Sequence, residues 1–464
     1  MSSAVRVASR GGCVLALAGS VAVCLWVVLA AAERPSFLSR PARLEFVPWL
    51  VGPLEHHLRS LTPDTVTLRT ELTVALGLLF ICWLAAWALA PRVPVEWIAA
   101  TLVLVHIAFL LGPPLSLTDL FNYLHYGRLG ALYHHNPYTD LPLVAPQDPG
   151  YRLTNWHHLP SPYGPLFTLV GYALAPLPLA TAYWTWKAIV TVASLGMLAI
   201  VGRLAVRLGR SPQRALALAG LNPLVLVYGL GGQHNEVLML LCGVGAVALL
   251  ARGRERAAGP GWDAAAGAAV VAGVAFKLSL LGLVPLVVLG ARRRPAALAG
   301  VAGAGAAVAL LVAGVFAGRL PATGIQGSLV TPLSAPQLAG LAAGAGGATP
   351  SVRSIAQVVL VVAVLAACAL VYIRREWVIP AAGAVMLATV LTLAWTVPWY
   401  VWWVLPFAAL SRGRALKAAV VALTVALALG AVPQSVELIH ALGYFPTRTP
   451  IGRANHVYFE RLVK

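Results

Sequence analysis

Two carboxylates lie beside segments that are apolar enough to span a membrane. Asp119 follows the apolar segment 95–111, and Glu236 comes directly before the apolar segment 237–251. An ionisable group at the edge of a bilayer is costly to hold without a function. A carboxylate that is partly shielded from water has a raised pKa and can act as a general base. Both are therefore candidate functional groups, with the alternative that Thr118 or Asp119 only caps a helix beginning at Leu120.

Basic and polar side chains in similar positions are candidates for binding an anion or a sugar. Residues 233–236 (Gln-His-Asn-Glu) offer donors, an acceptor and an imidazole, although His234 or Asn235 could instead cap the following helix. Lys277 lies in the middle of an apolar stretch, where a lysine either extends to the membrane surface or binds an anion such as a lipid phosphate. Arg128 is a second candidate for binding a phosphate.

Aromatic residues are concentrated in two places. The segment 114–165, which carries Tyr123 and Tyr163, is predicted to be a catalytic loop and not a simple connector. Residues 395–403 form a second aromatic cluster around Trp399. The alternative for this cluster is the belt of tryptophan and tyrosine that membrane proteins place at the lipid interface, with one or two of the rings facing a sugar or a lipid chain.

The composition excludes a soluble globular protein. Of the 464 residues, 59% are hydrophobic and 10% are charged, and the mean hydropathy is +0.82, which indicates an all-α integral membrane protein. The net charge of +18 does not indicate nucleic-acid binding, because the arginines gather in short clusters between apolar segments. The five cysteines lie in apolar segments and are expected to behave as small hydrophobes, without a disulfide framework or a metal cluster.

These clusters predict a helical bundle of about 13 transmembrane segments, in one polytopic domain spanning residues 1–464. The cytoplasmic N-terminus precedes the first segment, the acidic region 33–70 forms an outer loop, and the loop 114–165 is extracytoplasmic. Arginines at both ends of residues 262–290 require two passes, so this stretch is predicted to be a hairpin of short helices that turns near Lys277. The other segments are 13–32, 72–89, 95–111, 184–204, 215–230, 237–251, 297–317, 355–373, 378–394, 401–410 and 418–432.

Motifs for nucleotide and metal chemistry are missing from the sequence. It contains no Walker phosphate loop, no glycine-rich dinucleotide fingerprint and no zincin motif. This argues against an ATP-driven pump and against an enzyme that uses nucleotide sugars. A donor for chemistry on the outer face would have to be carried by a lipid.

An ordered set of motifs resembles a known family. The motifs are Asp119-x-x-x-Tyr123 with Gly127, Asn136-Pro-Tyr138, Pro162-Tyr163-Gly-Pro165, Asn222-Pro-Leu, residues 231–236 (Gly-Gly-Gln-His-Asn-Glu) and Gly273-Val-Ala-Phe-Lys277. Over residues 72–403 the chain resembles the C-type glycosyltransferase fold, and especially the actinobacterial polyprenyl-phosphomannose-dependent α-1,6-mannosyltransferases. Such proteins commonly have Asp where this chain has Glu236, and the region 33–70 has no counterpart.

The resemblance implies an inverting transfer on the extracytoplasmic face of the cell (inner) membrane, with Asp119 as the general base. The donor would be a polyprenyl-phosphate-linked sugar, most simply mannose, and the acceptor a glycan or glycolipid; no metal or cofactor is required. Lys277 and Arg128 would stabilise the leaving phosphate. The other residues that would bind substrate are Tyr123, Asn136, Tyr138, Tyr163, His234, Asn235, Glu236 and Trp399.

Two alternatives remain open at the level of sequence. One is a related transferase for another polyprenyl-phosphate sugar, such as arabinofuranose. The other is a transporter or flippase for lipid-linked sugars, which would keep its substrate chemically intact. Against the transporter, the sequence has no convincing internal repeat and no matching pair of broken helices.

Overall fold

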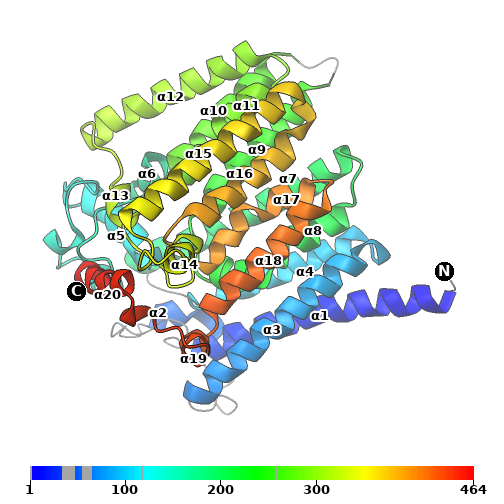
Figure 1. Ribbon diagram of the computed structural model, residues 1–464, viewed down its shortest axis with the longest axis horizontal. Coiled ribbons are helices and arrows are strands. Elements are labelled where there is room, and N and C mark those ends of the chain that lie inside the picture. The colour runs from blue at the N-terminus through cyan, green and yellow to red at the C-terminus, as the bar shows by residue number, and fades with distance from the viewer. Residues whose placement is uncertain (1–2, 34–47, 55–64, 116–118, 256–258, 464) are drawn as a thin grey trace.

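The computed structural model describes residues 3–33, 48–54, 65–115, 119–255 and 259–463, and these residues form helices and no strands. Seven of the described helices are long and apolar enough to cross a membrane. Figure 1 shows them packed side by side in one bundle. The predicted all-α membrane class is therefore confirmed, whereas the count of 13 spans and the single-domain division stay predictions.

The membrane-length helices occur close to their predicted segments, and α4 has the predicted bounds. Of the region 33–70, residues 34–47 and 55–64 lie outside the described part of the chain. The longer helices are α1 (Ser3–Glu33), α3 (Thr65–Leu89), α4 (Val95–Leu111), α7 (Leu179–Arg207), α9 (Glu236–Gly253), α12 (Arg294–Phe316), α15 (Pro350–Ile373), α16 (Val378–Thr392) and α18 (Arg414–Ala431). The shorter helices are α2 (Pro48–Val51), α5 (Asp119–Ala131), α6 (Pro165–Leu174), α8 (Pro212–Gly220), α10 (Gly261–Phe276), α11 (Leu283–Gly290), α13 (Thr323–Gln326), α14 (Ala335–Ala342), α17 (Leu405–Leu410), α19 (Ser435–Ala441) and α20 (Pro450–Val463).

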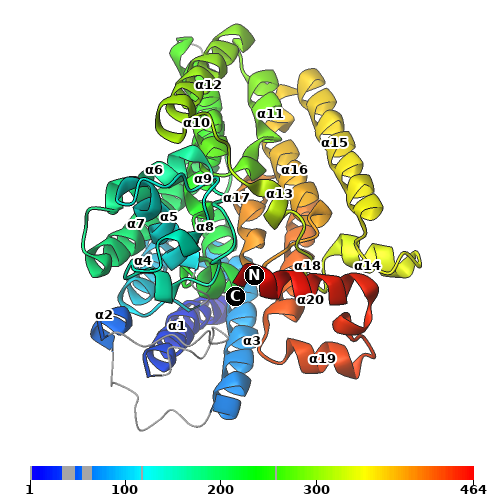
Figure 2. The ribbon, with the colours of Figure 1, turned by 90° about the vertical axis from the view of Figure 1, so that its left-hand side faces the viewer.

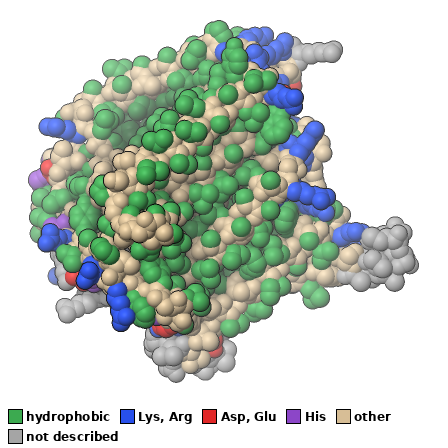
Figure 3. Space-filling model, in the orientation of Figure 1, with side chains coloured by type: hydrophobic (Ala, Val, Ile, Leu, Met, Phe, Trp, Pro, Cys, Tyr) green, Lys and Arg blue, Asp and Glu red, His purple; other side chains and the backbone are tan. Residues whose placement is uncertain are grey.

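The outer helices expose apolar surface on a scale that only lipid tolerates. Helices α12 and α15 lie on the outside of the bundle (Figure 2), and Leu310 and Leu365 are 75% and 62% exposed. Figure 3 shows hydrophobic side chains covering one face between edges that carry Lys and Arg. A soluble protein rarely exposes so large an apolar patch, so this face is expected to contact the hydrocarbon of a membrane.

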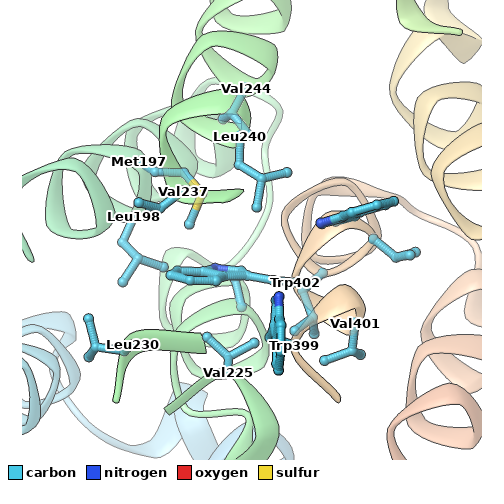
Figure 4. Close-up of a cluster of buried hydrophobic side chains, with 14 of the residues drawn as sticks. Met197, Leu198, Val225, Leu230, Val237, Leu240, Val244, Trp399, Val401 and Trp402 are labelled. Atoms are coloured by element: carbon cyan, nitrogen blue, oxygen red, sulfur yellow. The ribbon is translucent and has the colours of Figure 1, made fainter. Parts of the chain in front are cut away.

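The hydrophobic core joins the segment before α9 to the turn that carries Trp399. Trp402 is 1% exposed and packs among side chains of α7, α9 and the π-helical turn Val225–Leu230 (Figure 4). Glycine is needed at position 229, because a Cβ atom there would lie 2.9 Å from the Trp402 ring. This close approach holds the 3₁₀ turn Pro398–Trp403 against the segment that leads into α9.

Three regions differ from the simplest prediction. Within the segment 114–165, residues 119–131 form the helix α5 and not a loop. The segment 215–230 is interrupted after α8, where the Asn222 side chain accepts hydrogen bonds from the N–H groups of Leu224 and Val225 and Pro223 has no N–H to donate. The segment 401–410 is a 3₁₀ turn followed by the short α17.

The start of α10 and the end of α11 lie close together. Asp263 of α10 accepts hydrogen bonds from the N–H groups of Arg292 (3.3 Å) and Arg293 (3.0 Å), which follow α11. Between the helices, Lys277 is extended with φ −154°. The chain therefore doubles back at Lys277, and the long packing contact between α10 and α9 brings this break toward the start of α9.

Candidate active site

Asp119 is the first residue of α5 and is mostly shielded from solvent. Its side chain is 14% exposed, Oδ1 accepts a hydrogen bond from Nε1 of Trp156 (3.1 Å), and Oδ2 lies 3.6 Å from Nδ1 of His234. Burial raises the pKa of the Asp119 carboxyl to about 6, against the opposing effect of the Trp156 hydrogen bond. The group is thus ionised at neutral pH and remains a better base than an ordinary aspartate. Thr118, the other residue predicted as a cap, lies outside the described part of the chain.

His234 lies between side chains of two distant segments of the chain, α5 and the turn that carries Trp399. Its ring stacks on Trp399 with 3.6 Å between the centroids, and Nδ1 lies 3.3 Å from the Tyr123 hydroxyl. Its other nitrogen, Nε2, is buried and has no hydrogen-bond partner among the described residues. Burial lowers the pKa of His234 to about 3, so the imidazole is neutral at physiological pH and can exchange hydrogen bonds with a bound molecule.

Glu236 and Lys277 form a buried ion pair beside this histidine. Nζ of Lys277 lies 2.5 Å from Oε1 of Glu236, and the same oxygen accepts a hydrogen bond from Nε1 of Trp399 (3.1 Å). The Lys277 ammonium also lies over the rings of Tyr400 (5.3 Å) and Trp403 (5.5 Å). The Glu236 side chain is 1% exposed and that of Lys277 15%, so the lysine is the member of the pair that a ligand can reach.

Helix α7 supports both turns that carry these groups. Trp186 donates a hydrogen bond to the carbonyl of Gln233 (2.9 Å), and Lys187, fully buried, donates to the carbonyl of Gly112. A direct link joins the turns, because the N–H of Leu115 donates to the carbonyl of Gly231 (2.9 Å). The segments before Asp119 and before His234 are therefore fixed relative to one another by consecutive residues of one helix.

Aromatic rings and a close backbone contact enclose the cluster on another side. The Tyr123 ring meets that of Tyr163 edge to face, with centroids 4.9 Å apart. The next residue, Gly164, donates its N–H to the carbonyl of Phe276, and a Cβ atom at Gly164 would lie 2.1 Å from the Ala275 carbonyl oxygen. Only glycine permits this approach, which places the Tyr163 motif directly against the residues before Lys277.

Most of the predicted site residues come together. Asn235 is buried next to the cluster, and its side-chain amide has no hydrogen-bond partner among the described residues. The predicted residues of this cluster are Asp119, Tyr123, Tyr163, His234, Asn235, Glu236, Lys277 and Trp399. The sequence prediction did not include Trp156, the partner of Asp119; it belongs to the aromatic segment, but no local pattern pairs positions 37 residues apart.

Three predicted residues are engaged elsewhere. Nε of Arg128 donates to Oδ2 of Asp148 (2.7 Å). Burial opposes ionisation of Asp148, but hydrogen bonds from His125, Arg128 and the Gly150 N–H lower its pKa to about 2. The side chain of Asn136 bonds the Phe316 carbonyl, and Tyr138 bonds Thr168 and packs on the Phe316 ring. These residues join α5, α6 and α12 and do not line the cluster.

The described residues hold no group of three or more His, Cys, Asp or Glu side chains arranged to bind a metal ion. The site instead combines a shielded carboxylate, a neutral imidazole, a reachable ammonium and unpartnered buried polar atoms. This set can accept a proton from a hydroxyl, bind polar groups such as those of a sugar, and stabilise an anion.

Comparison with known proteins gives consistent matches. Residues 14–293 match the model of a family described as alpha-(1->6)-mannopyranosyltransferase, N-terminal domain. This range contains all of the cluster except Trp399 and its neighbours. No solved structure matches the chain.

Several curated proteins are similar over part of their length. A Mycolicibacterium smegmatis protein named "Probable alpha-(1->6)-mannopyranosyltransferase" is 31% identical over 150 residues, 30% of this chain and 26% of that protein. An alpha-(1->6)-mannopyranosyltransferase of Mycobacterium tuberculosis is 29% identical over 166 residues, 33% of this chain and 27% of the relative. Alpha-(1->6)-mannopyranosyltransferase A of Corynebacterium glutamicum is 26% identical over 162 residues, 34% and 32% of the two chains. The matches thus span about a third or less of each relative.

Proposed function

The chain belongs to the alpha-(1->6)-mannopyranosyltransferase family, as its motifs predicted, and we propose that it transfers mannose from a polyprenyl-phosphate donor to a glycan or glycolipid. The observation that carries this proposal is the cluster at Asp119. A shielded carboxylate of raised pKa lies there with a neutral histidine and with Lys277, a cation that a ligand can reach. An acceptor hydroxyl needs a base and a departing phosphate needs a positive charge, and the cluster offers both.

Asp119 is better suited than Glu236 to act as the base. Glu236 is held by Lys277 and Trp399 on the same oxygen, whereas Asp119 accepts one hydrogen bond from an indole and keeps part of its carboxylate exposed. In the proposed step, Asp119 takes the proton of the acceptor hydroxyl as its oxygen forms a bond to the anomeric carbon. The bond from that carbon to the phosphate oxygen breaks, and attack opposite the leaving group inverts the configuration.

The leaving group is a lipid phosphate that is already stable as an anion, so no strong general acid is needed. Lys277 is the candidate for stabilising the added negative charge, in a site where water is largely excluded. Arg128 is not a candidate for this role, because it forms an ion pair with Asp148. The free polar atoms of His234 and Asn235 are candidates for hydrogen bonds to sugar hydroxyls or to the donor phosphate.

The proposed donor suits a protein embedded in lipid. The exposed apolar helices α12 and α15 place the bundle in a membrane, where a lipid-linked sugar is also held. The other ends of α7 and α9 carry basic residues, which favours the cytoplasmic side for that end. These residues are Arg203, Arg207, Arg252 and Arg254. By this rule the Asp119 cluster faces the extracytoplasmic side.

The test is transfer of radiolabelled mannose from polyprenyl-phosphomannose, by membranes that contain the wild type, Asp119→Asn or Asp140→Asn. Asp140 is a carboxylate of the same segment that pairs with His135 away from the cluster, so its variant controls for charge loss. We expect Asp119→Asn to lose about 10²–10⁴-fold in rate at equal amounts of folded protein, and Asp140→Asn to remain active. Undiminished transfer by Asp119→Asn would refute the assignment of the base and make Glu236 the next residue to test.

A further inference from the structure

Four basic side chains meet at the opposite end of the bundle from the Asp119 cluster. Arg210 lies in the turn between α7 and α8, and Arg214 in the first turn of α8. Arg412 lies in the turn between α17 and α18, and Lys417 near the start of α18. Helices α8 and α17 pack together, Arg210 and Arg412 interact electrostatically, and Lys417 interacts with both Arg210 and Arg214. We call these four residues the basic cluster.

Arg210 has buried donors that nothing among the described residues accepts. Its Nε and Nη1 atoms are buried and have no hydrogen-bond partner in the described part of the chain. Burial and the neighbouring charge of Arg412 lower the pKa of the Arg210 guanidinium. Arg210 is only partly buried as a residue, but buried donors without a partner are costly, and the usual partner of the planar guanidinium is a carboxylate or a phosphate.

Two of the carboxylates at this end of the bundle have other partners. Glu255 lies 3.8 Å from Arg207 and 3.6 Å from Arg252, and Asp263 accepts hydrogen bonds from backbone N–H groups after α11. Among the described residues, no carboxylate forms an ion pair with a member of the basic cluster. No carboxylate of the described residues therefore neutralises the basic cluster, and an anion from outside the chain could do so.

Two helix N-termini add to the positive potential at the same place. Helix α18 begins at Arg414, after Gly413, with no side-chain cap, whereas α8 begins at Pro212 and the Ser211 side chain already accepts a hydrogen bond from the Arg214 N–H. The first N–H groups of a helix are free to bind an anion, and the helix dipole favours negative charge there. The space around Gly413 is open, since a Cβ atom there would meet nothing within 4 Å.

We propose that the basic cluster is a binding site for a phosphate group, carried either by an anionic membrane lipid or by a soluble phosphate. The Arg210 guanidinium would bind the phosphate, with Arg214, Arg412 and Lys417 around it. The site joins two elements that continue to the other end of the bundle. Helix α8 leads through the Val225–Leu230 turn to His234, and α17 follows the turn that carries Trp399, so a bound phosphate stabilises the packing beneath the Asp119 cluster.

The test compares the wild type with the double variant Arg210→Gln/Arg412→Gln. The control is Arg374→Gln, which leaves the basic cluster intact and removes an exposed charge from the turn after α15. Each purified protein is unfolded by heat in phosphatidylcholine nanodiscs, in nanodiscs that also contain phosphatidylglycerol, and in phosphatidylcholine with inorganic phosphate in place of chloride. We expect phosphatidylglycerol to raise the unfolding temperature of the wild type and of Arg374→Gln but not of the double variant. Retained phosphatidylglycerol, counted by native mass spectrometry, should be bound about tenfold less tightly for each guanidinium removed.

The arms separate the two sources of phosphate. Stabilisation by phosphatidylglycerol alone assigns the site to a lipid headgroup, and stabilisation by inorganic phosphate as well assigns it to the phosphate group itself. In phosphatidylcholine nanodiscs without added inorganic phosphate, the double variant should be at least as stable as the wild type. It removes the repulsion between the Arg210 and Arg412 charges and the buried donors of Arg210 that have no partner among the described residues. Equal responses of the wild type and the double variant, or no response of the wild type to either anion, would overturn the proposal.

Discussion

Removing the positive charge of Lys277 should destabilise the protein through the charge that it leaves behind. In Lys277→Met the carboxylate of Glu236, 1% exposed, keeps only the indole N–H of Trp399 at 3.1 Å, while its Oε2 atom has no partner among the described residues. Breaking a buried ion pair by removing one member typically costs about 3–5 kcal/mol. We expect the free energy of unfolding to fall by about this amount.

The reverse change should cost less. In Glu236→Gln the amide still accepts from Trp399, and the Lys277 ammonium, 15% exposed, keeps its contacts with the rings of Tyr400 and Trp403. A loss of about 1–3 kcal/mol is expected, the usual cost of a buried polar group that loses its partner. The double variant Glu236→Gln/Lys277→Met contains neither charge, so its loss should be smaller than the sum of the two single losses by about 1–3 kcal/mol.

The measurement is a double-mutant cycle from reversible unfolding in detergent micelles, with mannose transfer assayed on the same samples. The exposed pair of Arg69 and Glu437, 38% and 56% exposed, provides a control in which Glu437→Gln should change stability by no more than about 1 kcal/mol. The double variant at Glu236 and Lys277 should regain stability without regaining transfer, because the cation for the phosphate is still missing. Strict additivity of the two single losses would refute the idea that the two charges are coupled in the folded protein.

Three further outcomes are expected. Transfer should rise as the pH increases through about 6, because Asp119 acts as a base only when ionised and burial raises its pKa to about 6; the same midpoint should persist in His234→Gln, and its disappearance there would assign the titration to the histidine. Arg128→Gln should lower the unfolding temperature through loss of its bond to Asp148, with little change in the KM for the donor. A large rise in that KM would show that Arg128 binds the donor phosphate after all. Lys187→Met, which frees the carbonyl at the end of α4, should reduce kcat more than KM if the lysine positions Asp119; equal loss of folded protein and activity would show only a structural role.

The sequence predicted the membrane helices well because each depends on local apolar composition. The bounds of α4 were predicted to the residue, and α9 begins at Glu236, one residue before the predicted segment. A helix beginning at Leu120 was only the alternative prediction for the region of α5, because residues 119–131 are mixed in polarity and were assigned to a loop. This error also explains the prediction for Arg128. At about 100° per residue, Tyr123 and Gly127 lie on the same face of α5 as Asp119, whereas Arg128, nine residues on, points about 180° away.

The groups of the candidate site share one feature that hydropathy alone does not reveal. Asp119 begins a short helix after α4, and Glu236 begins α9 after a π-helical turn. Lys277 lies at the break between α10 and α11, and Trp399 lies in a 3₁₀ turn after α16. A continuous membrane helix satisfies its own backbone and has little reason to hold a charged side chain, whereas an interrupted helix exposes polar backbone that must be enclosed by protein or line a cavity.

The interruptions also explain which contacts could not be predicted. Each break is visible in the sequence as a polar or Pro-containing gap in an apolar segment, so most residues of the cluster could be predicted. The order in which the groups touch depends instead on packing between distant segments, such as Trp402 against the π-helical turn and Trp156 against α5. The polar breaks therefore indicate where the candidate site lies, and the buried aromatic contacts determine that Lys277 pairs with Glu236 and that Asp119, the proposed base, stays outside this pair.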